Sequence, residues 1–387
     1  MGIAKAIADW LEGRWVTPAY AGWLLAGLTL CFLLAAANTM VGWLYVLSGI
    51  AMALLAIAAI LPPRSLVGIQ VKRSPIPPVS AGDRLTISIA IENQTLQPKI
   101  LLEVRDILPF VLGEPAEQAI DLIPPQGVFK WVYYYQTKKR GIYRWHRLDL
   151  RTATPLGLFW CRRSRDAEAR AIVYPQVLLL SNCPIIDRMG EKDALKFRSD
   201  RRGFQNASEG LTRALRPYRV GDPFRLIHWR TSARHGELLV RELEVMTGGQ
   251  EVIICLDTAF TWNSDDFEQA VIAAGFLYFY ASRRQMNARL WTAATGLLQG
   301  YRVVLEALAA TNFNEEVKSD SYLPNLPAVW LTQNPDSLNG LPVGSRWVLW
   351  RPPDSERTEK NLVNHDYPGL TIDREEELAT QLQKRLW

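Results

Sequence analysis

The stretch QEVIICLDTAF, residues 250–260, contains a continuous apolar run from Val252 to Leu256 that ends at Asp257. An unbroken run of this length is typical of a strand buried on both faces of a parallel sheet. Ligands of such sheets bind at the carboxyl ends of the strands, near a switch in strand order. Asp257 is therefore a candidate for a polar site.

The chain on the carboxyl side of this stretch alternates between helical and strand patterns. In DDFEQAVIAAGFLYFYASRRQ, residues 265–285, apolar side chains fall on one helical face and two acids stand at the expected start. ARLWTAA, PAVWLTQ and SRWVLWRP read as strands, and YRVVLEALAAT reads as a helix. The alternation predicts a doubly wound α/β domain over residues 218–387, with a polar tail after Arg351 that ends in a short helix.

A different periodicity precedes this domain. In RLTISIAIEN, residues 84–93, Leu85, Ile87, Ile89 and Ile91 alternate with more polar residues, which is typical of a strand buried on one face. KWVYYYQT and GIYRWHRLDLRT continue the pattern. Short strands at this spacing predict a β-sandwich over residues 67–180, followed by a linker and the start of a further motif over residues 181–217.

The N-terminal part contains no charged residue between Arg14 and Arg64. A spanning helix needs about 20 apolar residues, so residues 1–66 are expected to contain a transmembrane hairpin with spans near 20–38 and 41–61. Asn38 and Thr39 mark the expected turn. Trp23 and Trp43 are expected interface anchors, and the apolar run is too long for a cleaved signal peptide.

The charges that flank the hairpin predict its orientation. Lys5 and Arg14 precede it, Arg64 and Lys72 follow it, and the turn carries no charge. Basic residues mark the cytoplasmic side, so both ends of the hairpin and the domains that follow are expected in the cytoplasm.

Bulk composition adds two bounds. The 387 residues carry a formal net charge of +5, an excess that by itself points to no partner. Four cysteines at irregular spacing form neither a metal motif nor a disulfide framework, and we expect them to be reduced packing residues.

The basic excess is concentrated in and before YRVGDPFRLIHWRTSARHGELLVRELE, residues 218–244. Between Arg198 and Arg241 there are ten arginines, no lysine and four acids, a net charge of +6. Asp222 before Pro223 predicts a helix N-cap, with a short helix that carries Arg230 and Arg234 on one face. A strand is expected over residues 238–245.

Three interpretations of this motif remain open. Its arginines can pair with neighbouring acids and hold the motif on the sheet, since guanidinium suits fixed bidentate pairing. They can also form a protein-docking surface with aromatic neighbours, because Arg, Trp and Tyr are enriched in interface hot spots. Phosphate or nucleic-acid binding is disfavoured, because lysine is absent and aromatic residues do not alternate with basic ones. The candidate interaction residues are Tyr218, Gly221, Asp222, Arg225, His228, Trp229, Arg230, Ala233, Arg234, Arg241 and Glu244.

No recognisable catalytic motif occurs in the sequence. It has four histidines, no Gly-x-Ser-x-Gly elbow, no His-Glu-x-x-His and no glycine-rich phosphate loop. His228 stands in a motif with a structural explanation and is expected to be a hydrogen-bonded core residue. We therefore expect a protein that is not an enzyme.

Three stretches carry a resemblance to a known family. GLTRALRPYRVGDPFRLIHWRTSARHGELLVRELE followed by a strand ending in LDT, together with KRGIYRWHRLDLRTATPLGLF and VYP upstream, resembles the bacterial domain-of-unknown-function family 58. That resemblance implies a C-terminal part related to von Willebrand factor A domains. It also implies a MoxR-type AAA+ ATPase as partner and, for many members, a transglutaminase-like membrane protein.

The resemblance also implies where a metal would bind. A von Willebrand A metal site reads Asp-x-Ser-x-Ser, which gives a hard divalent ion three oxygen ligands. Here the matching positions are Asp257, Ala259 and Thr261, and alanine offers no ligand atom. A structural role for Asp257 is therefore favoured over a Mg²⁺ site, and no cofactor is expected.

Together these features predict a non-catalytic membrane-anchored adaptor that binds another protein, with maturation of envelope or other complexes as its process. The alternative is a metal-dependent ligand-binding domain that acts through Asp257.

Overall fold

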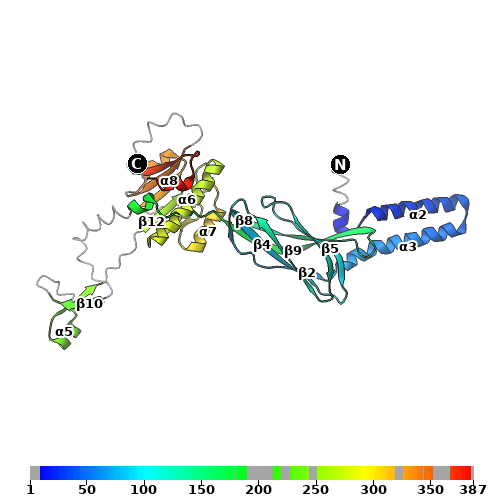
Figure 1. Ribbon diagram of the computed structural model, residues 1–387, viewed down its shortest axis with the longest axis horizontal. Helices are drawn as coiled ribbons and strands as arrows, with labels where there is room; N and C mark the ends of the chain where they lie inside the picture. Colours follow the sequence, from blue (N-terminus) through cyan, green and yellow to red (C-terminus); the bar gives the residue numbers. More distant parts are fainter. Residues whose placement is uncertain are drawn as a thin grey trace. The chain divides into compact units, whose positions relative to one another are not determined.

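The structure is a computed structural model that describes residues 9–178, 180–189, 212–218, 227–243, 251–318, 326–342, 344–351 and 367–384. The chain forms two compact units, Met1–Tyr174 and Pro175–Trp387 (Figure 1).

The first unit begins with the expected helical hairpin, α2 (Tyr20–Thr39) and α3 (Gly42–Ser65). The turn is tight because Met40 adopts a left-handed conformation, φ 55°, and donates its backbone N–H to the carbonyl of Ala36. Most apolar side chains of both helices are exposed, including Trp23 and Trp43, each at 66%. Both helices are long and apolar enough to cross a membrane. The predicted positions are confirmed, with α3 extending beyond residue 61 to Ser65.

An antiparallel β domain follows the hairpin. Three strands form one sheet in the order β2-β4-β7, and the others form a second sheet in the order β1-β9-β8-β5-β6, with β3 beside β9. All neighbours are antiparallel except β3 and β9. The strands are β1 (Thr17–Pro18), β2 (Ile69–Arg73), β3 (Val79–Ser80), β4 (Arg84–Asn93), β5 (Lys99–Asp106), β6 (Ala116–Ile123), β7 (Val128–Gln136), β8 (Gly141–Thr152) and β9 (Phe159–Tyr174).

One hydrophobic core is shared by the two sheets. Leu85, Ile87, Ile89 and Ile91 of β4 are fully buried, as the alternation predicted. They belong to the same cluster as the buried apolar residues of β5 and β8 in the other sheet. The alternation along β4 thus turns one face of the strand toward the second sheet. The apolar side chains of the two sheets bury each other in this shared core.

The second unit contains a mixed α/β sheet. Its strands are β12 (Glu251–Leu256), β13 (Asn287–Thr292), β14 (Gly296–Leu298), β15 (Ala328–Thr332), β16 (Arg346–Trp350) and β17 (Gly369–Ile372). Its helices are α6 (Ser264–Arg283), α7 (Tyr301–Ala310), the 3-10 helix η2 (Pro335–Gly340) and α8 (Leu378–Leu382). Helix α6 packs on β12, β13 and β15.

The strand order is β14-β13-β12-β15-β16-β17, in which all pairs are parallel except β13 with β14. The chain therefore runs outward from β12 in one direction and then from β15 in the other. Residues 252–256 are buried, as the unbroken apolar run predicted. Strands β14 and β17 have only three and four residues and were missed, and β17 lies in the segment expected to be a polar tail.

The cysteines are free, as expected, but they do not share one environment. Cys161, Cys183 and Cys255 are buried, and Cys31 is exposed on α2. The prediction that Cys31 packs inside the protein is therefore wrong, because its side chain lies on the exposed apolar surface of the hairpin.

Candidate functional site

The arginine-rich motif forms a small module around one antiparallel pair of strands. β10 (Thr212–Pro217) pairs with β11 (Leu239–Leu243), and the helix α5 (Trp229–His235) lies between them in sequence. Ile227 forms a further bridge with Val240 and is buried. The strand expected at 238–245 is present over Leu239–Leu243, and residues 244–245 lie outside the described residues.

The helix of the module begins later than predicted. His228, not Asp222, is the N-cap of the helix that carries Arg230 and Arg234. Nδ1 of His228 accepts the backbone N–H of Thr231 at 3.3 Å and lies 2.7 Å from the Thr231 hydroxyl. Because Ile227 pairs with Val240, the chain is extended just before His228 and cannot continue a helix from Pro223 through it. Gly236, at φ 74°, ends the helix in the left-handed conformation that glycine adopts without strain.

Two aspects of the module bear on docking. Trp229, the first residue of α5, is 63% exposed, and Ala233 one turn later is also exposed. Ser232 faces inward, and its hydroxyl accepts the backbone N–H of Leu239 at 2.9 Å. Tyr218 donates its backbone N–H to Leu238 and is half-buried. The module thus holds α5 against β11 through one face and leaves the Trp229 face uncovered.

The structure describes only part of the remaining candidate residues of the motif. Gly221, Asp222, Arg225 and Glu244 lie outside the described residues. Arg230 and Arg234 stand four residues apart on α5 and Arg241 lies on β11, but their side chains also lie outside the described part of the chain. Whether these arginines pair with acids or face a partner therefore stays a prediction.

Asp257 lies where the sequence predicted, directly after β12 and next to the end of β15. Its Oδ2 accepts a hydrogen bond of 2.7 Å from the Thr332 hydroxyl, the last residue of β15, and the residue is 8% exposed. Burial raises the pKa of Asp257, and hydrogen bonds from Thr332 and the Phe260 backbone oppose that rise. Its backbone carbonyl accepts the indole N–H of Trp262 at 2.7 Å. The carboxylate therefore joins β12 to β15 at the switch point of the sheet.

The contacts of the other proposed metal ligand favour the structural interpretation. The Thr261 hydroxyl donates to Oδ1 of Asn314 at 2.8 Å, and Ala259 contributes only a methyl group. Within the described ranges, no group of three or more His, Cys, Asp or Glu side chains is placed to hold a metal. The Mg²⁺ hypothesis stays a prediction that this donor set does not support.

A second carboxylate at the same edge of the sheet is fixed by the C-terminal segment. Asp266, in the first turn of α6, is 1% exposed. Its carboxylate accepts a hydrogen bond of 2.9 Å from Nε of Arg374, which stands two residues after β17. The same carboxylate accepts a hydrogen bond of 2.6 Å from the side-chain amide of Gln333. The sequence placed this carboxylate at the start of a helix, and its pairing with Arg374 is a structural contact that the sequence did not reveal.

Another polar cluster that the sequence did not reveal lies inside the β domain. Asp106, at the end of β5, is fully buried and accepts two hydrogen bonds from the Arg73 guanidinium, at 2.5 and 3.0 Å. It also accepts the Tyr133 hydroxyl at 2.6 Å and the Trp145 indole N–H at 3.1 Å. Burial and the nearby Asp106 carboxylate raise the pKa of Tyr133, which keeps its hydroxyl a donor. These side chains come from four strands and show no spacing in the sequence by which they could be grouped.

Comparison with known proteins gives a family match in the second unit and one distant curated relative. The profile of the family described as "Protein of unknown function DUF58" matches residues 214–294, which include most of β10 and all of α5, β11, β12, α6 and β13. The "Uncharacterized protein YeaD" of Bacillus subtilis (strain 168) is 24% identical over 204 residues, 51% of this chain and 49% of that protein. The chain thus spans about half the length of this curated relative.

Similarity to solved structures is weaker. The CARDB domain of PF1109 from Pyrococcus furiosus is 10% identical and covers 27% of this chain and 94% of its own, with a TM-score of 0.21. A β-glucosidase from Listeria innocua in complex with glucose is 10% identical over 26% of this chain and 16% of its own, with a TM-score of 0.15. Neither carries an argument about activity. What is confirmed is the resemblance drawn from the arginine-rich motif: this chain carries the DUF58 family match over residues 214–294, and YeaD of Bacillus subtilis is its distant homologue.

Proposed function

We propose that the protein is a non-catalytic membrane-anchored adaptor that binds another protein through its C-terminal unit. The exposed hairpin carries this proposal. Two consecutive helices of 20 and 24 residues leave most of their large apolar side chains exposed, and none of these side chains is buried. A bilayer is the solvent that covers such a surface over that length.

The basic flanks of the hairpin support a cytoplasmic position for both units. Arg14 and Arg64 are exposed beside the two helix ends. Lys72 pairs with Glu92 on the β domain. The turn at Met40 carries no charge. By the positive-inside rule this charge distribution favours both ends on the cytoplasmic side of a bacterial inner membrane.

The partner-binding part of the proposal rests on the second unit. The sheet order about β12 agrees with the doubly wound, von Willebrand A-like domain that the family resemblance implies. The motif module presents Trp229 at 63% exposure within a basic segment, and exposed tryptophan with neighbouring arginine is typical of interface hot spots. The resemblance suggests a MoxR-type AAA+ ATPase as partner, with a transglutaminase-like membrane protein as a further component.

Docking can be measured with the purified anchored chain and a MoxR-type ATPase from the same bacterium. Trp229→Ala is expected to weaken binding by about 2 kcal/mol, roughly 30-fold, because hot-spot residues lose at least that much on truncation. Tyr301→Ala is the matched control, since Tyr301 is 69% exposed on α7 and outside the module. Equal binding by folded Trp229→Ala and wild-type chains would remove the module from the interface.

The orientation has its own test. Protease added outside spheroplasts is expected to leave the β domain and the C-terminal unit intact, and detergent is expected to make both susceptible. Digestion before detergent is added would place the units outside the membrane and exclude a cytoplasmic ATPase as partner.

The alternative function, Mg²⁺-dependent ligand binding, rests on the position of Asp257 at the switch point of the sheet. Titration calorimetry of the full chain with Mg²⁺ is expected to show no saturable heat. A binding isotherm that disappears in Asp257→Ala would favour the alternative.

A further inference from the structure

Exposed apolar side chains surround the base of the helical hairpin. We call the following set the apolar rim. Its members, with their exposed fractions, are Trp15 (68%), Val67 (63%), Leu96 (80%), Leu101 (63%), Leu122 (53%) and Leu156 (44%). They come from six separate segments of the first unit, so no single amphipathic element accounts for them.

Backbone hydrogen bonds and strand pairing bring these six segments to the same end of the β domain. The carbonyl of Gly68, just after α3, accepts the backbone N–H of Gln94 at the end of β4. A backbone carbonyl of the β4–β5 turn accepts the N–H of Gln126, which lies in the β6–β7 turn. The carbonyl of Leu158, in the β8–β9 turn, accepts the N–H of Ala19 just before α2. The turn ends and the helix ends therefore form one surface.

Leu101 and Leu122 belong to the same surface through their neighbours. Ile100 pairs with Leu122 across β5 and β6, and the Thr152 hydroxyl donates to the carbonyl of Leu101 at 3.0 Å. Thr152 is the last residue of β8, two residues before the turn that carries Leu156.

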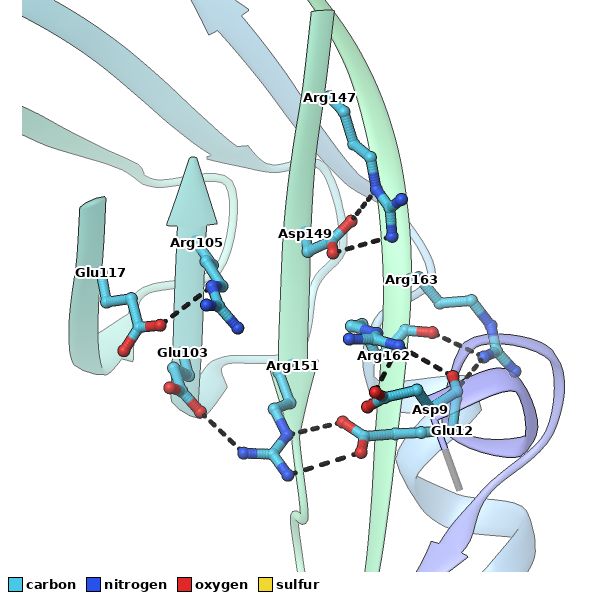
Figure 2. A network of polar contacts seen from close by, with 10 residues as sticks. All are labelled: Asp9, Glu12, Glu103, Arg105, Glu117, Arg147, Asp149, Arg151, Arg162 and Arg163. Carbon is cyan, nitrogen blue, oxygen red and sulfur yellow. Dashed lines mark hydrogen bonds and ion pairs between the residues drawn. The ribbon is translucent and has the colours of Figure 1, made fainter. Parts of the chain in front are cut away.

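Arginines of β8 and β9 bind the chain on both sides of the hairpin, and Figure 2 shows two of them, Arg151 and Arg163, beside Glu12. Arg151 binds Glu12 at 2.6 Å, and Arg163 donates to the carbonyls of Gly13 and Trp15 at 2.9 and 3.3 Å. Arg165 donates to the carbonyl of Leu66 at 2.9 Å, just after α3. These contacts hold the turn before α2 and the end of α3 on β8 and β9, so the helices do not hang on flexible linkers.

The connections on both sides of the hairpin are very short. Only Ala19 separates β1 from α2, and only Leu66, Val67 and Gly68 separate α3 from β2. A 20-residue helix is about 30 Å long, which equals the hydrocarbon thickness of a bilayer. If α2 spans, its first residue lies at the headgroup boundary, and the rim must lie within the same layer.

The chemistry of the rim suits that layer. Tryptophan is enriched at membrane interfaces, where its ring is apolar and its N–H remains wet. Trp10 is 60% exposed on the helical turn before Trp15, and Arg14 and Arg64 are exposed at the base of the hairpin. Amphipathic protein surfaces of this kind bury apolar side chains about 5–10 Å into the headgroup and acyl boundary.

We infer that the rim is a lipid-binding surface, with which the hairpin-proximal end of the β domain inserts into the interfacial layer of the bilayer. This inference rests on the proposed membrane anchoring of α2 and α3. The hairpin then does more than attach the protein to the membrane. It also sets how deeply the β domain lies in the bilayer surface.

Site-directed spin labelling of the full chain in phospholipid nanodiscs tests the rim. Leu96→Cys and Leu101→Cys are made in a Cys31→Ser background, in which the remaining cysteines are buried. Accessibility to oxygen, which concentrates in lipid, is compared with accessibility to a water-soluble nickel chelate. Phe110→Cys is the matched control, because Phe110 is 97% exposed in the loop that follows the opposite end of β5. The native Cys31, exposed near the middle of α2, reports on the anchor.

The expected result is an oxygen-to-nickel ratio at Leu96 and Leu101 several-fold above that at Phe110, and below that at Cys31. A ratio at the rim equal to that at Phe110, with Cys31 still in lipid, would overturn the inference and leave the anchor intact. Low accessibility of the rim labels to both reagents would show that protein covers the rim, which also overturns it. An aqueous ratio at Cys31 would instead overturn the anchoring itself.

Discussion

Asp106 shows how much the β domain depends on single buried side chains. It accepts hydrogen bonds from three residues, and the Arg73 side chain paired with it is only 2% exposed. Asp106→Asn removes the charge and leaves the Arg73 guanidinium buried without a counter-ion. We expect a loss of about 3–5 kcal/mol in the stability of the β domain, the usual result of breaking a buried pair.

The stability of the β domain is measured by urea unfolding, with hydrogen exchange at residues of β4 and β5 as the readout. Glu117→Gln is the control, because it breaks the pair of Glu117 with Arg105, in which both side chains are about half exposed. Exposed pairs contribute about 0–1 kcal/mol, so this variant is expected to stay near wild type. Equal effects of the two substitutions would contradict the interpretation.

Asp257 makes a prediction about pH. Because burial raises its pKa above the ordinary 3.8, the native state binds this proton more tightly than the unfolded chain does. The stability that the proton contributes is present below pH 3.8 and is lost as the pH rises through the folded-state pKa. Asp257→Asn keeps an acceptor for Thr332 and carries no charge, so we expect it to be at least as stable as wild type at pH 7.

Thermal unfolding of both chains between pH 4 and 7 measures this difference. The advantage of Asp257→Asn over wild type should increase with pH within that interval. A variant that is clearly less stable at pH 7 would show that the charged carboxylate has a favourable partner, as a metal site requires.

For single residues, the sequence predicted where a side chain lies in the fold better than it predicted which residues bind that side chain. It placed Asp257 at the end of a buried strand, because an apolar run that stops at a carboxylate is visible in the sequence. It could not predict that Thr332 and Arg374 would supply the hydrogen bonds at this edge, because these residues are 75 and 108 positions away from Asp257 and Asp266.

Among the elements, α2 is joined closely to the β domain at Gly22. A Cβ built there would lie 2.2 Å from the carbonyl oxygen of Leu158, so any side chain must push the helix from the β8–β9 turn. Gly22→Ala is therefore expected to destabilise the first unit by about 1–3 kcal/mol through overpacking.

Gly27→Ala in the same helix is the matched control, since a Cβ there meets nothing within 4 Å. Alanine favours helix over glycine by roughly 0.5–1 kcal/mol, so this variant should be neutral or slightly stabilised. Thermal melts of the two proteins in nanodiscs compare them, and a Gly22→Ala chain as stable as Gly27→Ala would mean that α2 is not packed on Leu158.

The motif shows where local patterns mislead. Asp-Pro is a good helix start, yet the helix that carries Arg230 begins at Trp229 with His228 as its cap. The extended pairing of Ile227 with Val240 decides this, because a residue in a bridge cannot also lie in a helix. The strand β17 was missed for a related reason, since a four-residue strand becomes recognisable only beside Trp347 and its neighbours in β16.

For the molecule as a whole, the division at Tyr174 and Pro175 predicts two separate unfolding transitions. Asp106→Asn should lower the melting temperature of one transition, and Thr332→Val, which removes a donor to the buried Asp257, should lower that of the other. Loss of one buried hydrogen bond to a carboxylate costs about 1–3 kcal/mol. Scanning calorimetry of the full chain checks this, and a single transition shifted by both variants would mean that the units unfold as one.

The sequence by itself determined the classes of structure along the chain: an apolar hairpin, an antiparallel β domain and an α/β domain. Each has a periodicity set by its backbone geometry and its solvent, so the local order of apolar residues is enough to identify it. Only the tertiary structure decided which turns surround the base of the hairpin, which strands flank β12, and which side chains neutralise Asp106 and Asp266. These are contacts between residues far apart in the chain, and they depend on strand order and turn geometry, which hydrophobic periodicity does not encode.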